Sequence, residues 1–194
     1  MNVHVSSNLA LPEGVALKAL TPHRDSRGTL VEIYRDMWDL GCRPVQVNAV
    51  TSGANVLRGV HVHVAHTDHL VVVAGKMILG LHDMRDKSPT AGMSCLVELD
   101  AANPRAAMIP VGVAHGFYFP EPSLTVYGVS QYWNEDDEFG CRWECPELKL
   151  PFPATNPLLS DRDAAAGDYA ELRAAFQAGW ARHRPRIEPA GIAR

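Results

Sequence analysis

Val56–His61 reads VLRGVH, and about fifty residues later Ile109–Phe117 reads IPVGVAHGF. Each stretch places a histidine after a glycine-marked bend, between runs of residues that favour β-strands. If His61 and His115 face inward from a small β-barrel, they form a compact polar site inside an apolar cavity. The two stretches therefore predict both a β fold and the place where a small molecule would react.

Further short segments rich in β-branched residues surround these two stretches, and turn signals separate them. They are Thr29–Tyr34, Val45–Val50, His69–Val73, Lys76–His82, Ser94–Leu99 and Leu124–Val129. Many short strands without intervening helical repeats predict an antiparallel sandwich or jelly-roll barrel. The tail differs, because Asp168–Phe176 carries apolar residues at helical spacing and predicts a terminal helix opened by Asp168.

The composition indicates an ordinary globular domain. A chain of 194 residues with 46% apolar content can bury a core. Its net charge of -4 gives no reason to expect a nucleic acid or an anionic membrane surface as partner. The longest apolar run, Leu70–Ala74, is far shorter than the ~20 residues that cross a bilayer. No secretory signal is visible at the N-terminus, and four irregularly spaced cysteines fit free thiols, so we expect a cytoplasmic protein.

The histidines near His61 also permit a metal site. A three-histidine, one-carboxylate set can be drawn from this part of the chain, and such sets bind metal ions. Its members are His61, His63, Asp68 and His115. Pro110–His115 has the Pro-x-Gly-x-x-His spacing of metal-binding cupins. His66 and His82 are expected to be polar surface residues.

Several segments share a second pattern, which covers roughly residues 15–166. They are Asp25–Gly28, Leu57–His61, Asp83–Arg85, Ser88–Gly92, Ile109–Phe117, Tyr127–Trp133, Gly140–Trp143 and Leu159–Asp163. In order and spacing they resemble the dTDP-4-dehydrorhamnose 3,5-epimerase family of cupin-fold nucleotide-sugar epimerases. The resemblance implies a mainly β fold over residues 1–194, a single cupin domain with a double-stranded β-helix jelly-roll barrel. Residues 167–194 would then form a short C-terminal helix and a tail.

The resemblance also implies an isomerase that uses no metal and no organic cofactor. Epimerisation beside a ketone needs a base, a group that holds the enolate oxygen, and an acid on the other face. By the family pattern His61 is the base and Asp163 orients its imidazole, as in the His–Asp pair of a hydrolase. Tyr127 matches the acid.

Other positions match residues that bind the substrate in the family. They are Arg27, Glu32, Gln46, Asn48, Arg58, His69, His115, Trp133, Glu138 and Arg162. Guanidinium groups suit phosphate oxygens, and an indole can stack on a nucleotide base. One position departs from the family, which has an enolate-stabilising lysine about ten residues after the catalytic histidine. This chain has His69 there, in a shorter loop.

The sequence therefore predicts an epimerase of deoxysugar and polysaccharide biosynthesis. It would act at C3, C5 or both of a nucleotide-diphosphate-linked 4-keto-6-deoxy sugar, as a homodimer with exchanged N-terminal strands. Two alternatives stay open: a metal-dependent cupin enzyme, built on the set described above, and a sugar-nucleotide-binding cupin without turnover. The sequence leaves open the sugar, the base and the number of inverted centres.

Overall fold

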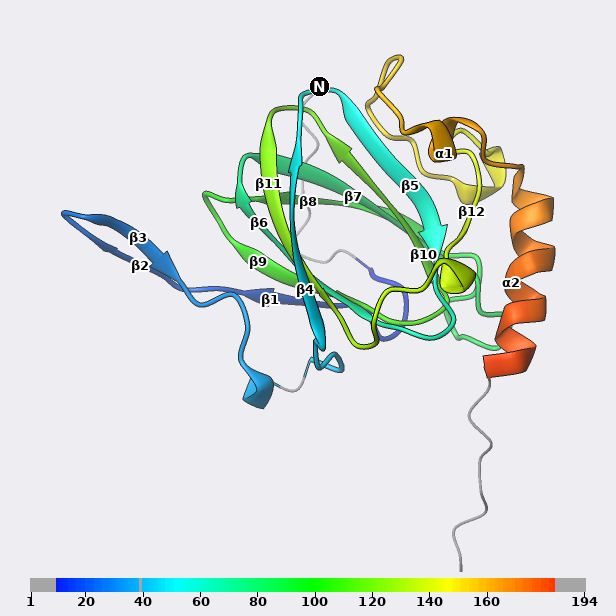
Figure 1. Cartoon of the computed structure of the whole chain (residues 1–194), viewed down its shortest axis with the longest axis horizontal. Helices are drawn as coiled ribbons and strands as arrows, with labels where there is room; N and C mark the ends of the chain where they lie inside the picture. Colours follow the sequence, from blue (N-terminus) through cyan, green and yellow to red (C-terminus); the bar gives the residue numbers. More distant parts are fainter. Residues whose placement is uncertain (1–9, 39, 184–194) are drawn as a thin grey trace, which may run out of the picture.

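The computed structural model describes residues 10–38 and 40–183, in which two antiparallel β-sheets form the body of the fold (Figure 1). The first sheet has the order β1 (Ala16–Ala19), β9 (Arg105–Ile109), β6 (Asp68–Ala74), β11 (Ser123–Val129) and β4 (Gln46–Ser52). The second has the order β12 (Phe139–Gly140), β5 (Val56–Val62), β10 (Val113–Phe119), β7 (Lys76–Asp83) and β8 (Ser94–Asp100). The non-sequential strand orders are those of a jelly-roll barrel, which confirms the predicted fold.

Smaller elements complete the described chain. They are the hairpin of β2 (Pro22–Asp25) and β3 (Gly28–Val31), the 3-10 helices η1 (Asp36–Trp38), η2 (Glu135–Asp137) and η3 (Pro146–Leu148), and the helices α1 (Asp161–Ala164) and α2 (Tyr169–His183). The predicted strand over Thr29–Tyr34 ends earlier, at Val31. Within the described residues, no helix is long and apolar enough to span a membrane. The predicted tail after residue 183 lies outside the described residues.

An apolar core lies between the two sheets. Leu70 of β6, Leu79 and Leu81 of β7, and Ile109 of β9 belong to one buried cluster, and none of them is more than 1% exposed. Burying one such side chain stabilises the fold by ~1.5–3 kcal/mol. The predicted strands are therefore held in place by apolar side chains that alternate toward this core.

Helix α2 covers the second sheet from outside (Figure 1). Leu172 and Phe176, one turn apart, are each 2% exposed and pack in a second apolar cluster that includes residues of β5 and β10. Asp168 Oδ1 accepts a hydrogen bond from the backbone N of Glu171 at 3.0 Å, and Glu171 Oε2 accepts one from the backbone N of Asp168 at 3.1 Å. This reciprocal cap confirms the predicted start of the helix.

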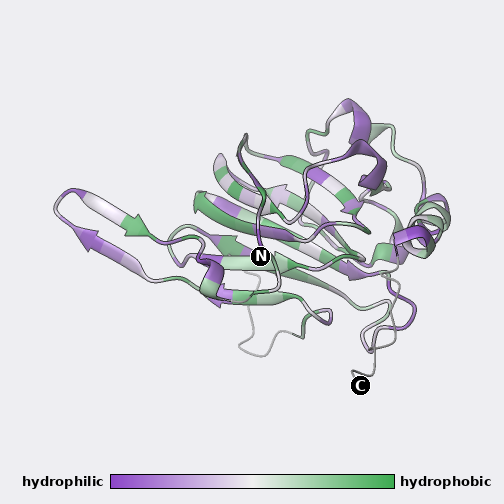
Figure 2. Ribbon diagram, turned by 60° about the horizontal axis from the view of Figure 1, so that its bottom comes forward, coloured by the Kyte–Doolittle hydropathy of each residue, from purple (hydrophilic) through white to green (hydrophobic). Residues whose placement is uncertain are grey.

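The β2–β3 hairpin stands away from the barrel (Figure 2). It forms a sheet of its own, and Leu30 at its end is 62% exposed. A two-stranded hairpin without a packed face is marginally stable in water. The β2–β3 hairpin is therefore placed to pack against the surface of another protein chain.

The loop after β7 is organised by one carboxylate. Asp83 Oδ1 accepts a hydrogen bond from Arg85 Nε at 2.8 Å, while Asp83 Oδ2 accepts bonds from Ser88 Oγ and Thr90 Oγ1, each at 2.6 Å. Burial opposes the charge of Asp83, but these hydrogen bonds outweigh burial and lower the pKa of the carboxyl to about 2. The Asp-x-Arg…Ser-Pro-Thr segment thus has a structural role.

Replacing this carboxylate is expected to make the free energy of unfolding less dependent on pH in the acid range. Asp83→Asn should lower the free energy of unfolding by about 2 kcal/mol at pH 7. Because the folded pKa lies below the unfolded value of ~3.9, the contribution is complete above that value and is lost as the pH falls toward the folded pKa. Denaturant unfolding of both proteins between pH 7 and pH 2 measures this. A difference that stays constant over the range would contradict it, and exposed Asp136→Asn serves as the control.

Candidate active site

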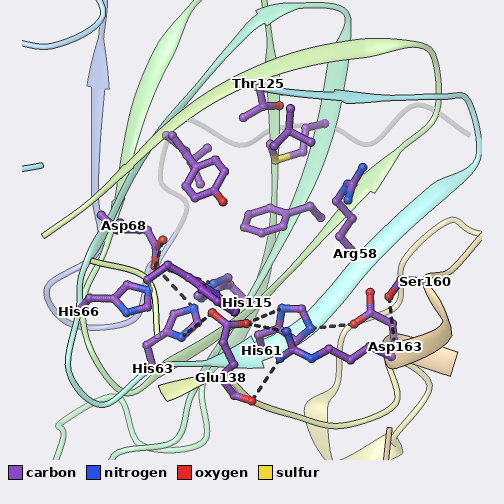
Figure 3. A pocket seen from close by; sticks show the side chains of 18 of the residues that line it. Arg58, His61, His63, His66, Asp68, His115, Thr125, Glu138, Ser160 and Asp163 are labelled. Carbon is purple, nitrogen blue, oxygen red and sulfur yellow. Dashed lines mark hydrogen bonds and ion pairs between the residues drawn. The ribbon is translucent and has the colours of Figure 1, made fainter. Parts of the chain in front are cut away.

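A cavity of about 310 Å³ lies between the two sheets (Figure 3). Apolar side chains, among them Leu70, Met77, Phe117 and Phe119, form one part of its wall. The polar part is lined by Arg58, His61, His63, His66, Asp68, His115, Thr125, Tyr127, Trp133, Glu138, Ser160, Arg162 and Asp163. An enclosed apolar space with convergent polar groups is the usual form of a small-molecule site.

A short hydrogen bond joins His61 to Asp163, 102 residues later in the chain. His61 Nε2 lies 2.7 Å from Asp163 Oδ1, and Asp163 Oδ2 accepts a second bond from the backbone N of Gly59 at 3.3 Å. Ser160 is the N-cap of α1, because its Oγ accepts a bond from the backbone N of Asp163 at 3.1 Å. The cap places Asp163 in the first helical turn, facing β5.

The pair fixes which nitrogen of His61 can accept a proton. Burial opposes the charge of Asp163, but the bonds from His61 and Gly59 outweigh it, and the pKa of the carboxyl is lowered. An ionised Asp163 only accepts hydrogen bonds, so the hydrogen of the neutral imidazole is on Nε2. Nδ1 then carries the lone pair, and the neighbouring Glu138 Oε2, at 3.9 Å, is too distant for a hydrogen bond.

Gly59 allows β5 to approach β10 closely. Its φ is +98°, and a Cβ at this position would lie 2.8 Å from the backbone oxygen of His115. His115 is also the residue directly opposite His61 in the β5–β10 register. The glycine of the Arg-Gly-x-His motif is therefore required by close backbone packing, and it supplies the N–H that binds Asp163.

Tyr127 enters the same cavity from the other sheet. It lies on β11, which pairs with β4 and β6, whereas His61 lies on β5. Burial, together with the negative charges of Asp68 and Glu138, raises the pKa of Tyr127. Its hydroxyl thus keeps its proton at neutral pH and can donate it.

Two guanidinium groups supply positive charge to the cavity. Arg162 Nη1 donates to Glu138 Oε2 at 3.0 Å, and Arg58 Nε donates to Ser52 Oγ at 3.1 Å. Both side chains line the cavity, where forked N–H groups suit the oxygens of an anionic ligand.

The structure brings most of the predicted site residues to one cavity. The predicted residues that line it are Arg58, His61, His115, Tyr127, Trp133, Glu138, Arg162 and Asp163. Gln46 lies beside the cavity, since its Oε1 accepts a bond from the backbone N of Trp133 at 3.0 Å and its Nε2 donates to Asn48 Oδ1 at 3.1 Å. Arg27 and Glu32 do not line it: Arg27 pairs with Asp25 at 2.6 Å in the hairpin, and Glu32 pairs with Arg35 at 2.5 Å.

His69, which was expected to bind the substrate, does not line this cavity. His69 Nε2 lies 2.8 Å from the backbone oxygen of Ile33, and burial lowers the pKa of its imidazole. Successive side chains of a strand point to opposite faces, and it is Asp68 and Leu70 of β6 that line the cavity. Asp68, next to the position assigned to the family lysine, therefore faces the cavity with an acidic side chain.

The prediction that His66 and His82 are surface residues is wrong. His66 is 3% exposed and lines the cavity. His82 is 2% exposed, with Nδ1 2.8 Å from Ser94 Oγ and Nε2 2.9 Å from Tyr169 Oη.

Sequence reasoning also missed two supporting residues. Asp137 is 4% exposed, and its Oδ1 accepts a bond from the backbone N of Val64 at 2.7 Å. It sits in an acidic run that reads as a solvated surface. Ser160 did have a signal, because a serine three residues before an acid is typical of a helix N-terminus.

The barrel defines the class of this protein, a cupin fold with a histidine–aspartate pair in its cavity. The family model for dTDP-4-dehydrorhamnose 3,5-epimerase matches residues 9–171. The chain belongs to this family, which confirms the resemblance found in its motifs.

Individual relatives agree with this assignment. A dTDP-4-dehydrorhamnose 3,5-epimerase of Neisseria gonorrhoeae is 35% identical over 172 residues, which are 84% of this chain and 52% of the relative, so the chain spans about half of that protein. The structure of dTDP-6-deoxy-D-glucose-3,5-epimerase from Legionella pneumophila, in complex with dTDP-4-keto-L-rhamnose, has a TM-score of 0.75 and 31% identity, covering 82% of this chain and 92% of that one. A 3'-monoepimerase of Streptomyces bikiniensis in complex with dTDP-quinovose has a TM-score of 0.75 and 27% identity, covering 87% and 89%.

Gly59→Ala is expected to destabilise the fold more than the same change at Gly92. Both glycines have positive φ, +98° and +72°, but only at Gly59 would the new Cβ meet backbone atoms. A strained φ costs of order 1–2 kcal/mol, and the contact at Gly59 adds to it. Denaturant unfolding of the two variants measures the difference. Equal losses would show that the close approach of β5 and β10 adds nothing to the strain.

Proposed function

We propose that this chain is a cytoplasmic enzyme that epimerises C3, C5 or both of a nucleotide-linked 4-keto-6-deoxy sugar. The observation that carries the proposal is the 2.7 Å contact of His61 Nε2 with Asp163, which leaves Nδ1 free to accept a proton in the cavity. The ligand named for the Legionella pneumophila structure and the monoepimerase of Streptomyces bikiniensis support this class of substrate and one or two inverted centres.

The first step is removal of a proton from the carbon beside the ketone. His61 Nδ1 takes this proton, and Asp163 stabilises the imidazolium that forms, as in other histidine–aspartate pairs. The electron pair of the broken C–H bond moves to the keto oxygen and gives an enolate. Tyr127 returns a proton to the same carbon from the facing sheet, which inverts the centre.

We assign the binding of the substrate's diphosphate and of its nucleotide base to the rest of the cavity wall. Arg58 and Arg162 supply guanidinium groups for phosphate oxygens, and His115 lies between β5 and β7 in the same wall. Trp133 is 51% exposed, which suits an indole that stacks on a nucleotide base.

The metal-dependent cupin alternative is not favoured. The family model and the relatives are those of epimerases, and a metal-dependent cupin has no use for Tyr127, Asp163 and Trp133 together in the cavity wall. A binding protein without turnover would keep the cavity and lack proton exchange, so an exchange experiment separates it from an epimerase.

His61→Asn should abolish exchange of the sugar's α-proton, whereas Tyr127→Phe should keep exchange and slow product formation. A positioned acid or base typically contributes 10²–10⁴-fold to the rate, so losses of that size are expected. Incubation of dTDP- and GDP-4-keto-6-deoxy sugars in deuterated water, read by NMR, locates the label at C3 or C5. His183→Asn, at the exposed end of α2, is the control. Equal loss of exchange in both active-site variants would argue against separate acid and base roles.

We also propose that the enzyme is a homodimer with exchanged N-terminal segments. Arg27 and Glu32 belong to the expected substrate-binding set, yet they lie on or next to a hairpin that stands away from the cavity of their own chain (Figure 1). Val45 and Val47, at the free β4 edge of the first sheet, are 52% and 65% exposed. A second chain would cover this edge and bring its hairpin to the cavity.

Mixing two inactive variants tests this exchange. If Arg27 serves the partner's cavity, a dimer of one His61→Asn chain and one Arg27→Ala chain has one complete site. Random re-association of equal amounts should then restore about one quarter of the wild-type activity, because half of the dimers are mixed and each has one good site. Analytical ultracentrifugation checks that dimers form. An unchanged activity after mixing would contradict the assignment of Arg27 to the partner's site.

A further inference from the structure

Next to the His61–Asp163 pair, three more histidines surround one buried carboxylate (Figure 3). His66 Nε2 lies 3.9 Å from Asp68 Oδ1, while His63 Nε2 and His115 Nε2 lie 4.0 and 3.9 Å from Asp68 Oδ2. All four side chains are at most 6% exposed. We call this group the Asp68 cluster.

The second nitrogen of each imidazole in the Asp68 cluster is already engaged. His63 Nδ1 lies 2.9 Å from the backbone oxygen of Asp137, and His66 Nδ1 lies 2.9 Å from Asp137 Oδ2. His115 Nδ1 lies 3.1 Å from the backbone oxygen of Val113. Carbonyl and carboxylate oxygens only accept hydrogen bonds, so each neutral ring carries its hydrogen on Nδ1 and turns a bare Nε2 toward Asp68.

The Asp68 cluster therefore gathers acceptors around a common point. Within residues 10–38 and 40–183, the carboxylate of Asp68 receives no protein hydrogen bond and pairs with no lysine or arginine. These acceptors line the cavity and have no donor among the described residues, so water or a bound ligand has to satisfy them. A bound cation would satisfy all four groups at once.

We propose that His63, His66, Asp68 and His115 form a binding site for one divalent transition-metal ion of the Zn²⁺ type. Imidazole nitrogens with one carboxylate suit first-row transition ions better than Mg²⁺ or Ca²⁺. With Zn–N distances of ~2.0–2.1 Å, tetrahedral ligand atoms lie ~3.3 Å apart, so the Asp68–imidazole distances have to shorten by about 0.6 Å. The ligand atoms of His63, His66 and Asp68 already lie within 4.8 Å of one another, and His115 has to move in as the fourth ligand. The hydrogen bonds from Nδ1 to Asp137 and Val113 orient the rings, which is typical of the groups behind metal ligands.

The proposed ion site is distinct from the proton-transfer pair. His61 lies outside the group of ligand atoms that lie close enough together to share an ion, so its Nδ1 stays free when the ion binds. The cavity is lined by the acids Asp68, Glu138 and Asp163 and by two guanidinium groups. A divalent ion would make the charge of the cavity more positive, which favours binding of an anionic ligand. The site departs from the expectation of a metal-free chain drawn from the family resemblance. A favourable effect of the ion on the sugar rests on the proposed function, whereas ion binding does not.

Metal binding by the whole chain tests the proposal directly. Chelator-treated protein, titrated with Zn²⁺ in a calorimeter, should bind one ion per chain. Asp68→Asn and His66→Asn should each weaken Zn²⁺ affinity by about tenfold or more, and exposed His183→Asn, at the end of α2, should leave it unchanged. Thermal unfolding shows whether each variant is folded. Wild-type protein loaded with Co²⁺ should show the visible spectrum of an ion bound by nitrogen ligands, which needs no variant.

Two results would overturn the ion site. One is Zn²⁺ binding that is equally strong in wild type, Asp68→Asn and His66→Asn; the other is a Co²⁺ spectrum that stays that of the hydrated ion. Deuterium exchange into the sugar, measured with and without Zn²⁺, reports separately on the proposed function. Loss of exchange with intact Zn²⁺ binding would contradict the epimerase, and exchange without Zn²⁺ binding would contradict the ion site.

Discussion

The buried carboxylate of Asp163 is the constraint on which the arrangement of the cavity depends. An ionised carboxylate that is 7% exposed must be paired with donors, or it would cost several kcal/mol. Its partners are the backbone N of Gly59 and the Nε2 of His61, while Ser160 caps the turn that carries it. The hydrogen bonds that stabilise the buried charge also fix the tautomer of His61.

The barrel determines how the rest of the cavity can act. Its two sheets face each other, so groups on β5 and β11 enter one cavity from opposite sides. A base and an acid on opposite faces of a planar enolate are what inversion of a carbon centre requires. Leu70, Met77, Phe117 and Phe119 form an apolar part of the wall, and a less polar surrounding strengthens the interactions of the polar groups.

Local sequence patterns were enough to predict the strands and the start of α2. The β-branched runs alternate toward the core, and Asp168 is a local cap. Asp163 is different, because its partner is 102 residues away. No local pattern links these residues, and only the resemblance to a family suggested the pair.

The errors have physical causes as well. A one-residue slip along a strand moves a side chain to the other face, which is why His69 was predicted in the place that Asp68 occupies. His66 lies in the connection between β5 and β6, and it is buried by contacts with Asp137, 71 residues later. Arg27 lies at the turn of the hairpin, away from the cavity of its own chain, and only the proposed dimer would bring it to a cavity.

The tautomer of His61 tests the central claim most directly. Long-range ¹H–¹⁵N correlation spectra of protein labelled at histidine nitrogens distinguish a protonated Nε2 from a protonated Nδ1, and His61→Asn identifies the signals. We predict that His61 in the free protein near neutral pH carries its hydrogen on Nε2, with Nδ1 bare. A hydrogen on Nδ1 with Nε2 bare would contradict the account, because the nitrogen that faces the cavity could then not accept the proton of the sugar.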